Sequence, residues 1–84
     1  MPYIPNNERI MVDPTIGDMG RGQTPGHLNF QITTLCLDYL ADKIHNYQHY
    51  NDVIGALECC KLEMYRRAIA PYEDSKKEAN GDVY

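Results

Sequence analysis

Two stretches of the sequence carry apolar residues at helical spacing. In the first, apolar side chains recur every three or four residues between Pro25 and His45, as on a helix with one buried face. Thr24 and Pro25 form a favourable start, since threonine caps the first amides and proline fits the first helical position. The sequence therefore predicts a helix over about residues 25–45. Its apolar positions are Leu28, Ile32, Leu35, Cys36, Tyr39, Leu40 and Ile44.

The second stretch runs over about residues 51–79 and has a wider apolar face. At about 100° per residue, its apolar side chains cover about half of the helix circumference. One covering helix needs an apolar stripe of only about 100°, so this face exceeds what a single partner helix covers. Pro71 lacks a backbone donor and predicts a kink, and Asn80-Gly81 predicts the helix end. The apolar positions are Val53, Ile54, Leu57, Cys60, Leu62, Met64, Tyr65, Ala68, Ile69 and Tyr72.

The rest of the chain predicts little regular structure. Residues 1–24 contain several prolines and predict an irregular N-terminal arm, in which residues 8–12 form either one helical turn or a short extended segment. Four of the six glycines fall within residues 17–26, which predicts a mobile loop. No stretch has the alternation of a strand.

The predicted fold class is all-α, a helical hairpin with an irregular arm. We expect one domain over residues 1–84, made of the arm and glycine-rich loop (1–24), the hairpin (25–79) and a tail (80–84). A chain of 84 residues lies near the lower limit of independent stability, and such chains often gain stability by disulfides, metals or oligomerisation.

The cysteines do not indicate a disulfide framework. Their number is odd, and Cys59 and Cys60 are adjacent, which disfavours pairing with each other. We expect Cys36, Cys59 and Cys60 to be reduced and largely buried residues of an intracellular protein. Oligomerisation, with the chain as its own partner, is then the expected source of added stability.

Charge and hydropathy exclude two classes of partner. The formal net charge of −4 argues against binding to extended DNA or RNA, whose phosphates attract basic surfaces. No apolar run reaches the roughly 18 residues that a membrane span requires, and no signal segment opens the chain, so we expect no membrane association.

A small phosphorylated ligand is compatible with the arginine pair of the second helix. Arg66 and Arg67 offer two guanidinium groups for phosphate, and Tyr65 or Tyr72 offers a ring on which a base stacks. Tyr3 or the glycine-rich loop would close such a site. The other interpretation is a solvated cationic patch in which the arginines pair with Glu63 or Asp74.

Glu58 and Lys61 lie inside the predicted apolar arc, three residues apart, where they can pair on one face. They form either a partly buried ion pair with extended aliphatic stems or part of the ligand site.

Other motifs give weaker indications. Gly17-x-x-Gly20-x-Gly22 resembles a phosphate cradle, but no apolar strand precedes it and no Lys-Ser/Thr pair follows it. His45 and His49 are four apart, yet the Asn46–His49 stretch is expected to break the helix, so these histidines are expected to be polar turn residues. We expect no metal site and no cofactor.

An enzyme is the minority interpretation. Helical nucleotide pyrophosphohydrolases hold magnesium between carboxylates one helical turn apart. Asp38 and Asp42 have this spacing, whereas Glu58 and Glu63 are five apart and diverge by about 140°. The four-carboxylate set is therefore incomplete, and we expect a non-catalytic protein.

Two segments together resemble a known family. The chain opens with Met1-Pro2-Tyr3-Ile4 and closes, after Asp52, with DVIGALECCKLEMYRRAIAPYEDSKKEANGDVY. These segments resemble short phage and bacterial proteins of uncharacterised function that begin with MPYI and end with NGDVY. The resemblance covers nearly the whole chain and implies a cytoplasmic protein of a bacterial host cell, but no activity.

A second resemblance concerns Leu57-Glu58 and Arg67-Ala68-Ile69-Ala70. These residues are similar to the helical hairpin of phage anti-defence sponges, oligomers that sequester cyclic nucleotide signals of CBASS or Thoeris immunity. The spacing between the two elements is one residue longer here, and the resemblance implies the general mode of action alone.

These observations lead to one main hypothesis and one alternative from a different class. The main hypothesis is a homo-oligomer of phage type that binds or sequesters a small phosphorylated ligand, such as a cyclic nucleotide immune signal. The expected ligand-binding residues are Tyr3, Glu58, Lys61, Tyr65, Arg66, Arg67 and Tyr72. The alternative is a protein–protein interaction module that docks a host or phage protein through the wide apolar face.

Overall fold

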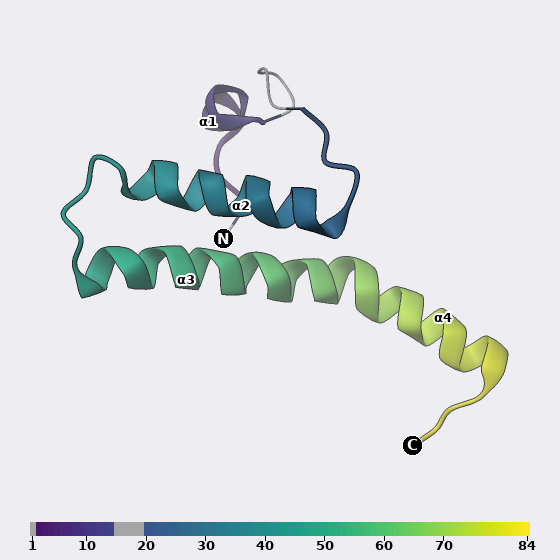
Figure 1. Cartoon of the computed structure of the whole chain (residues 1–84). Helices are drawn as coiled ribbons and strands as arrows, with labels where there is room; N and C mark the ends of the chain where they lie inside the picture. Colours follow the sequence, from purple (N-terminus) through teal and green to yellow (C-terminus); the bar gives the residue numbers. More distant parts are fainter. Residues whose placement is uncertain (1, 15–19) are drawn as a thin grey trace. The chain divides into compact units, whose positions relative to one another are not determined.

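The computed structural model describes residues 2–14 and 20–84. All regular structure within these residues is helical, which confirms the all-α prediction (Figure 1). The chain divides into two compact units, residues 2–53 and residues 54–84, and the helix α3 (Tyr47–Met64) runs from the first into the second. The hairpin geometry and the single-domain organisation stay predictions.

The arm contains a short helix, α1 (Asn6–Val12). Of the two conformations predicted for residues 8–12, the helical one is observed and the extended one is not. The carbonyl of Pro5 accepts hydrogen bonds from the amides of Glu8 and Arg9, both at 3.0 Å. The Arg9 Nε donates to the carbonyl of Ile4 at 2.7 Å and so ties the segment before α1 to the helix.

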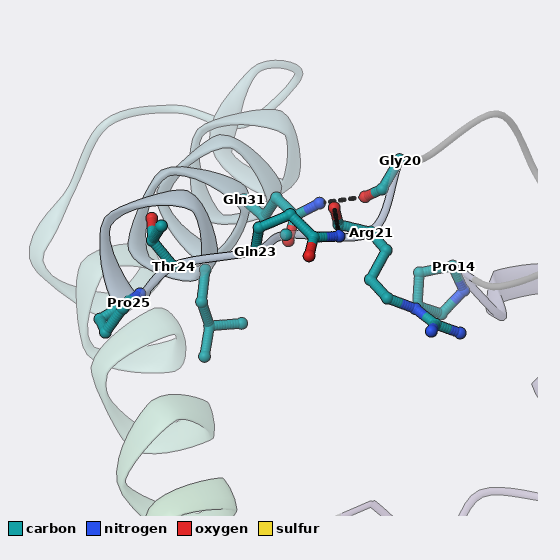
Figure 2. Close-up of a pocket in the computed structure, with 9 residues that line it drawn as sticks. Pro14, Gly20, Arg21, Gln23, Thr24, Pro25 and Gln31 are labelled. Atoms are coloured by element: carbon teal, nitrogen blue, oxygen red, sulfur yellow. Dashed lines mark hydrogen bonds between the residues drawn. The ribbon is translucent and has the colours of Figure 1, made fainter.

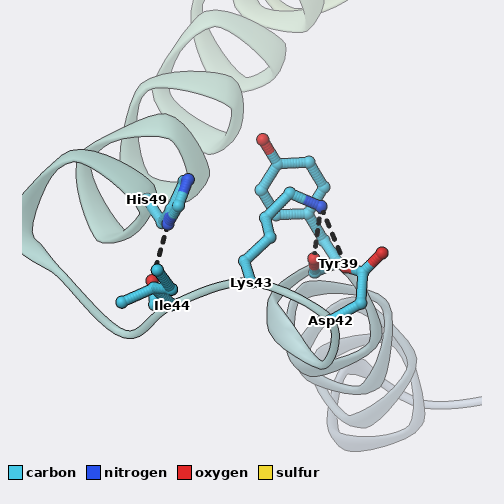
Figure 3. A network of polar contacts seen from close by, with 5 residues as sticks. All are labelled: Tyr39, Asp42, Lys43, Ile44 and His49. Carbon is cyan, nitrogen blue, oxygen red and sulfur yellow. Dashed lines mark hydrogen bonds and ion pairs between the residues drawn. The ribbon is translucent and has the colours of Figure 1, made fainter.

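The second helix, α2 (Pro25–Leu40), begins as predicted and ends earlier. The Thr24 Oγ1 accepts from the His27 amide at 3.1 Å, the expected N-cap. The predicted end near residue 45 is wrong, because the chain leaves the helix after Leu40 and turns tightly (Figure 3). Lys43 stabilises this end: its Nζ donates to the Tyr39 carbonyl at 2.8 Å and lies 3.8 Å from the centroid of the Tyr39 ring.

Helix α3 begins earlier than predicted. The Asn46 Oδ1 accepts from the amide of His49 at 3.0 Å, so Asn46 caps the helix and Tyr47 is its first residue. The predicted start near residue 50 or 51 is therefore wrong, and the break lies before Tyr47 rather than at Asn46–His49. The His49 Nδ1 is also hydrogen-bonded to the Ile44 carbonyl, at 2.6 Å, which holds the turn on its other side.

Beyond α3 the helix continues through a π-helical turn, η1 (Tyr65–Ile69), into α4 (Ala70–Asn80). The ribbon bends as it passes into α4 (Figure 1). The irregularity predicted at Pro71 thus takes the form of a widened turn directly before it. Gly81 ends α4 as predicted: its φ is +95°, which favours glycine, and its amide donates to the Lys77 carbonyl at 2.8 Å.

Little of the described chain is buried. Leu40, 8% exposed, is the one buried residue among residues 2–14 and 20–84. The three cysteines are free; Cys36 is half-buried, whereas Cys59 and Cys60 are exposed. The expectation that the cysteines are largely buried is wrong for this adjacent pair in the single chain. Within the part that the structure describes, no helix combines the length and the hydropathy of a membrane span.

Candidate functional site

One candidate surface is an apolar face on the long helix of residues 54–80. None of these residues is buried in the single chain. Leu57, near the middle of the predicted arc, is 38% exposed, and Tyr72 is 62% exposed. The exposed apolar face consists of Ile54, Leu57, Cys60, Leu62, Met64, Tyr65, Ala68, Ile69 and Tyr72.

Three ion pairs lie on this helix: Glu58–Lys61, Glu63–Arg66 and Asp74–Lys77. The Lys61 Nζ is 3.1 Å from the Glu58 Oε1, which confirms that these residues pair, but both side chains are more than half exposed. Glu63 pairs with Arg66, as the second interpretation of the arginines predicts. The Glu63 side chain is 21% exposed and that of Arg66 is 69% exposed, so the guanidinium remains open to solvent while the carboxylate is partly covered.

The predicted ligand residues around the π turn have different surroundings. Tyr65, Arg66 and Arg67 all lie within η1, and all three are exposed. Tyr72 lies in α4, where the Lys76 Nζ is 5.6 Å from the centroid of its ring. Tyr3 lies in the other unit and is half exposed, and its role in closing a site stays a prediction.

Tyr65 is engaged by a carboxylate through its hydroxyl, while its role in stacking stays a prediction. Its hydroxyl donates to the Glu73 Oε1 at 2.7 Å. This hydrogen bond, with the negative charges of Glu73 and Asp74, raises the pKa of Tyr65 above its usual 10.0, because the phenolate would lose the bond and meet two carboxylates. Farther along α4, Lys77 lies 4.0 Å from Asp74.

An open groove of about 500 Å³ lies beside Tyr65, between α4 and the C-terminal tail. Its lining mixes acids with bases, so its charge does not favour a phosphate group. The arginines are not among its lining residues, which are Tyr65, Ala70, Glu73, Asp74, Lys76, Lys77, Asn80, Gly81, Asp82, Val83 and Tyr84. The ligand set that the sequence predicts is therefore not gathered in this groove.

A larger pocket, of about 680 Å³, lies at the start of α2 in the other unit (Figure 2). The Gln31 Nε2 donates to the carbonyl of Gly20 and joins the helix to the segment before it. A Cβ at Gly22 would come within 2.9 Å of the Gln31 Oε1 and 3.1 Å of the His27 Cβ, so the glutamine side chain would have to shift to accommodate it. Gly17 of the cradle-like motif lies outside the described residues. The lining residues are Pro14, Gly20, Arg21, Gly22, Gln23, Thr24, Pro25, Leu28 and Gln31.

The geometry does not assemble the enzyme-like carboxylate pair. Asp38 lies in α2, whereas Asp42 lies in the turn after it and pairs with Lys43 at 3.3 Å. The two carboxylates therefore do not occupy neighbouring turns of one helix. Among the residues that the structure describes, no group of three or more His, Cys, Asp or Glu side chains is placed to hold a metal ion.

Sequence reasoning missed the bond between Tyr65 and Glu73. Residues eight apart lie more than two turns, or about 12 Å, from each other along the axis of a regular α-helix, so the usual search at spacings of three and four passes over them. A proline between the two was the available signal, because proline changes the geometry of the turn before it.

Comparison with known proteins agrees with the expectation that the chain belongs to a family of uncharacterised function. No curated protein and no solved structure matches the chain. One family model, described as a domain of unknown function (DUF6899), matches residues 1–83. Because the match covers almost the entire sequence, the chain belongs to this uncharacterised family, DUF6899.

Proposed function

We propose that the chain is a non-catalytic helical module that assembles with copies of itself through the apolar face of residues 54–72. The observation that supports the proposal is the exposure of this face along a helix with no buried residue. Burial of a Leu, Met or Tyr side chain contributes roughly 1.5–3 kcal/mol, so covering the face is a large gain for so short a chain.

A second copy of the chain is the partner that best fits this surface. The long helix lacks a core of its own, so its cover has to be present whenever the chain is folded. A copy of the same chain is present wherever the chain is expressed, and its assembly then depends on the concentration of the chain. Apolar and aromatic residues dominate the surface, as they do in an obligate interface, and the Glu58–Lys61 ion pair lies within it.

The experiment is sedimentation velocity on the wild type and on the variant Leu57→Ser/Met64→Ser. We expect the wild type to sediment as an oligomer and the variant to dissociate at the same concentration. Val83→Ser is the matched control, because Val83 is an exposed apolar residue of the tail, and it is expected to leave the oligomer intact. A wild type that is folded and monomeric at micromolar concentration contradicts self-assembly and favours docking of a different protein.

Binding of a small phosphorylated ligand, such as a cyclic nucleotide signal, is the second candidate function. The observation in its favour is that two neighbouring arginines are exposed in a π-helical turn, an element that is frequent at functional sites. Assembly would bring several copies of these guanidinium groups together, as symmetric oligomers do. Glu63 competes for one of them, because it pairs with Arg66.

This competition gives a sharp test. In calorimetric titrations with cyclic dinucleotides, cyclic trinucleotides and cyclic ADP-ribose isomers, Glu63→Gln is expected to bind more tightly than the wild type, and Arg66→Ala/Arg67→Ala is expected not to bind. Lys76→Ala/Lys77→Ala removes two charges elsewhere on the helix and serves as the control. Equal affinity in all variants, or no binding at all, would exclude a phosphate site at the arginines.

A further inference from the structure

The π turn and the hydrogen bond that spans it occur together in the unit of residues 54–84. Pro71 has no amide hydrogen for the carbonyl of Arg67, four residues earlier, and its ring crowds that carbonyl. The turn before it is π-helical, and the Ala70 amide donates to the Tyr65 carbonyl five residues back instead of four. The helix therefore accommodates one additional residue between Tyr65 and Ala70.

The additional residue changes which side chains share a face. In a regular α-helix, residues eight apart are separated by about 80° around the axis, and residues seven apart by only about 20°. With one residue taken up by the π turn, the eight-residue interval from Tyr65 to Glu73 is equivalent to seven. Their 2.7 Å hydrogen bond thus depends on the widened turn.

We propose that the hydrogen bond from Tyr65 to Glu73 is a latch that stabilises the π turn and fixes the direction in which α4 leaves α3. Tyr65 and Glu73 both belong to the unit of residues 54–84, and the segment between them contains the rest of the π turn and Pro71. With the turn in place, Tyr72 instead of Pro71 is the equivalent of the seventh residue after Met64. The latch therefore keeps a line of apolar residues, Leu57, Met64 and Tyr72, continuous across the bend.

The latch is independent of what covers the apolar face. The latch consists of a hydrogen bond within one helix. Its test therefore measures the local stability of that helix, whereas the test of self-assembly measures molar mass. If the chain does not self-associate, the latch proposal is unaffected. If the latch is absent, self-association is still tested separately by sedimentation.

The test is amide hydrogen exchange, followed by NMR, in Tyr65→Phe. Loss of one ordinary hydrogen bond corresponds to a change of about two- to tenfold in a local opening equilibrium, so the Ala70 amide is expected to exchange faster by that factor. Amides of residues 50–60 should keep their wild-type rates, which shows that the helix is folded. Tyr72→Phe is the matched control, since it removes another tyrosine hydroxyl of the same helix, about two turns from Tyr65, and its Ala70 amide should exchange as in the wild type. An unchanged Ala70 rate in Tyr65→Phe would overturn the latch.

A second variant tests the dependence of the bond on the turn. Pro71→Ala restores the missing amide, so the turn is expected to become α-helical and to separate Tyr65 from Glu73. The absorbance titration of the tyrosines, compared with the same titration of Tyr65→Phe, isolates the contribution of Tyr65. In Pro71→Ala that contribution should move to lower pH than in the wild type; a titration at the wild-type position would contradict the coupling.

Discussion

Residues 20–49 and residues 54–80 are both helical, but they are stabilised in different ways. In the first region, side chains bond to backbone groups at the helix ends: Thr24 caps α2, Lys43 binds the carbonyl of Tyr39, and Asn46 caps α3. In the second region, polar contacts run mainly between side chains. The apolar residues of both regions are largely exposed, with Leu40 the buried exception among the described residues. The boundaries of the first region are thus set within the chain, whereas for the second we propose that a second copy of the chain covers its apolar face.

The largest expected effect comes from breaking the second region. Leu57→Asp/Met64→Asp places two charges on the apolar face, and at about 1.5–3 kcal/mol per buried side chain the assembled protein should lose about 3–6 kcal/mol of stability. Urea denaturation at a fixed protein concentration measures the loss. Val83→Asp, in the exposed tail, should change stability little, and equal losses in both variants would show that the face is not covered.

The stability of the first region should depend on the side chains that cap its helices. Thr24→Ala removes the acceptor of the His27 amide and should destabilise the fold by about 1 kcal/mol. Thr34→Ala is the control, because the Thr34 hydroxyl bonds within the helix to the Phe30 carbonyl at 2.8 Å, where alanine is a better helix former. Thermal denaturation measures the stability of both variants relative to the wild type. If Thr24→Ala is as stable as Thr34→Ala, the cap contributes nothing to the first region.

Two glycines of the long helix should respond in opposite directions. A Cβ at Gly55 meets nothing within 4 Å, so Gly55→Ala should stabilise the helix by about 0.5–1 kcal/mol. Gly81 has a φ of +95°, so Gly81→Ala strains the helix end and should destabilise it by about 1 kcal/mol. Far-UV circular dichroism during heating measures both. A destabilised Gly55→Ala would indicate that a partner approaches this position closely.

The smallest effect concerns pH. Because the pKa of Tyr65 is raised in the folded state, the bond to Glu73 contributes stability fully below pH 10, and this contribution is lost as the pH rises through the folded-state pKa. Glu73→Gln keeps an acceptor but removes the charge, so the pKa of Tyr65 should fall toward its usual value. The difference between the absorbance titrations of Glu73→Gln and of Glu73→Gln/Tyr65→Phe gives the pKa of Tyr65 in the variant. A pKa equal to that in the wild type would mean that Glu73 does not act on Tyr65.

Local signals gave the helices and several of their ends, while contacts that depend on three-dimensional geometry were missed. Thr24 and Gly81 were predictable because their roles depend only on neighbouring residues. The end of α2 at Leu40 was not, since apolar spacing continues to Ile44 and the contribution of Lys43 appears only in the folded turn. The pair Glu58–Lys61 and the pair Glu63–Arg66 follow from spacing, but the bond between Tyr65 and Glu73 exists only because a π turn shifts the register.

The central claim, that the long helix needs a copy of the chain to cover it, is tested most directly by one dilution series. Molar mass by light scattering and helicity by far-UV circular dichroism are measured on the same wild-type samples from high to submicromolar concentration. We expect the mass to fall toward that of the 9.7 kDa chain and the helicity to fall with it. A single chain that retains its full helicity at the lowest concentration would contradict the claim.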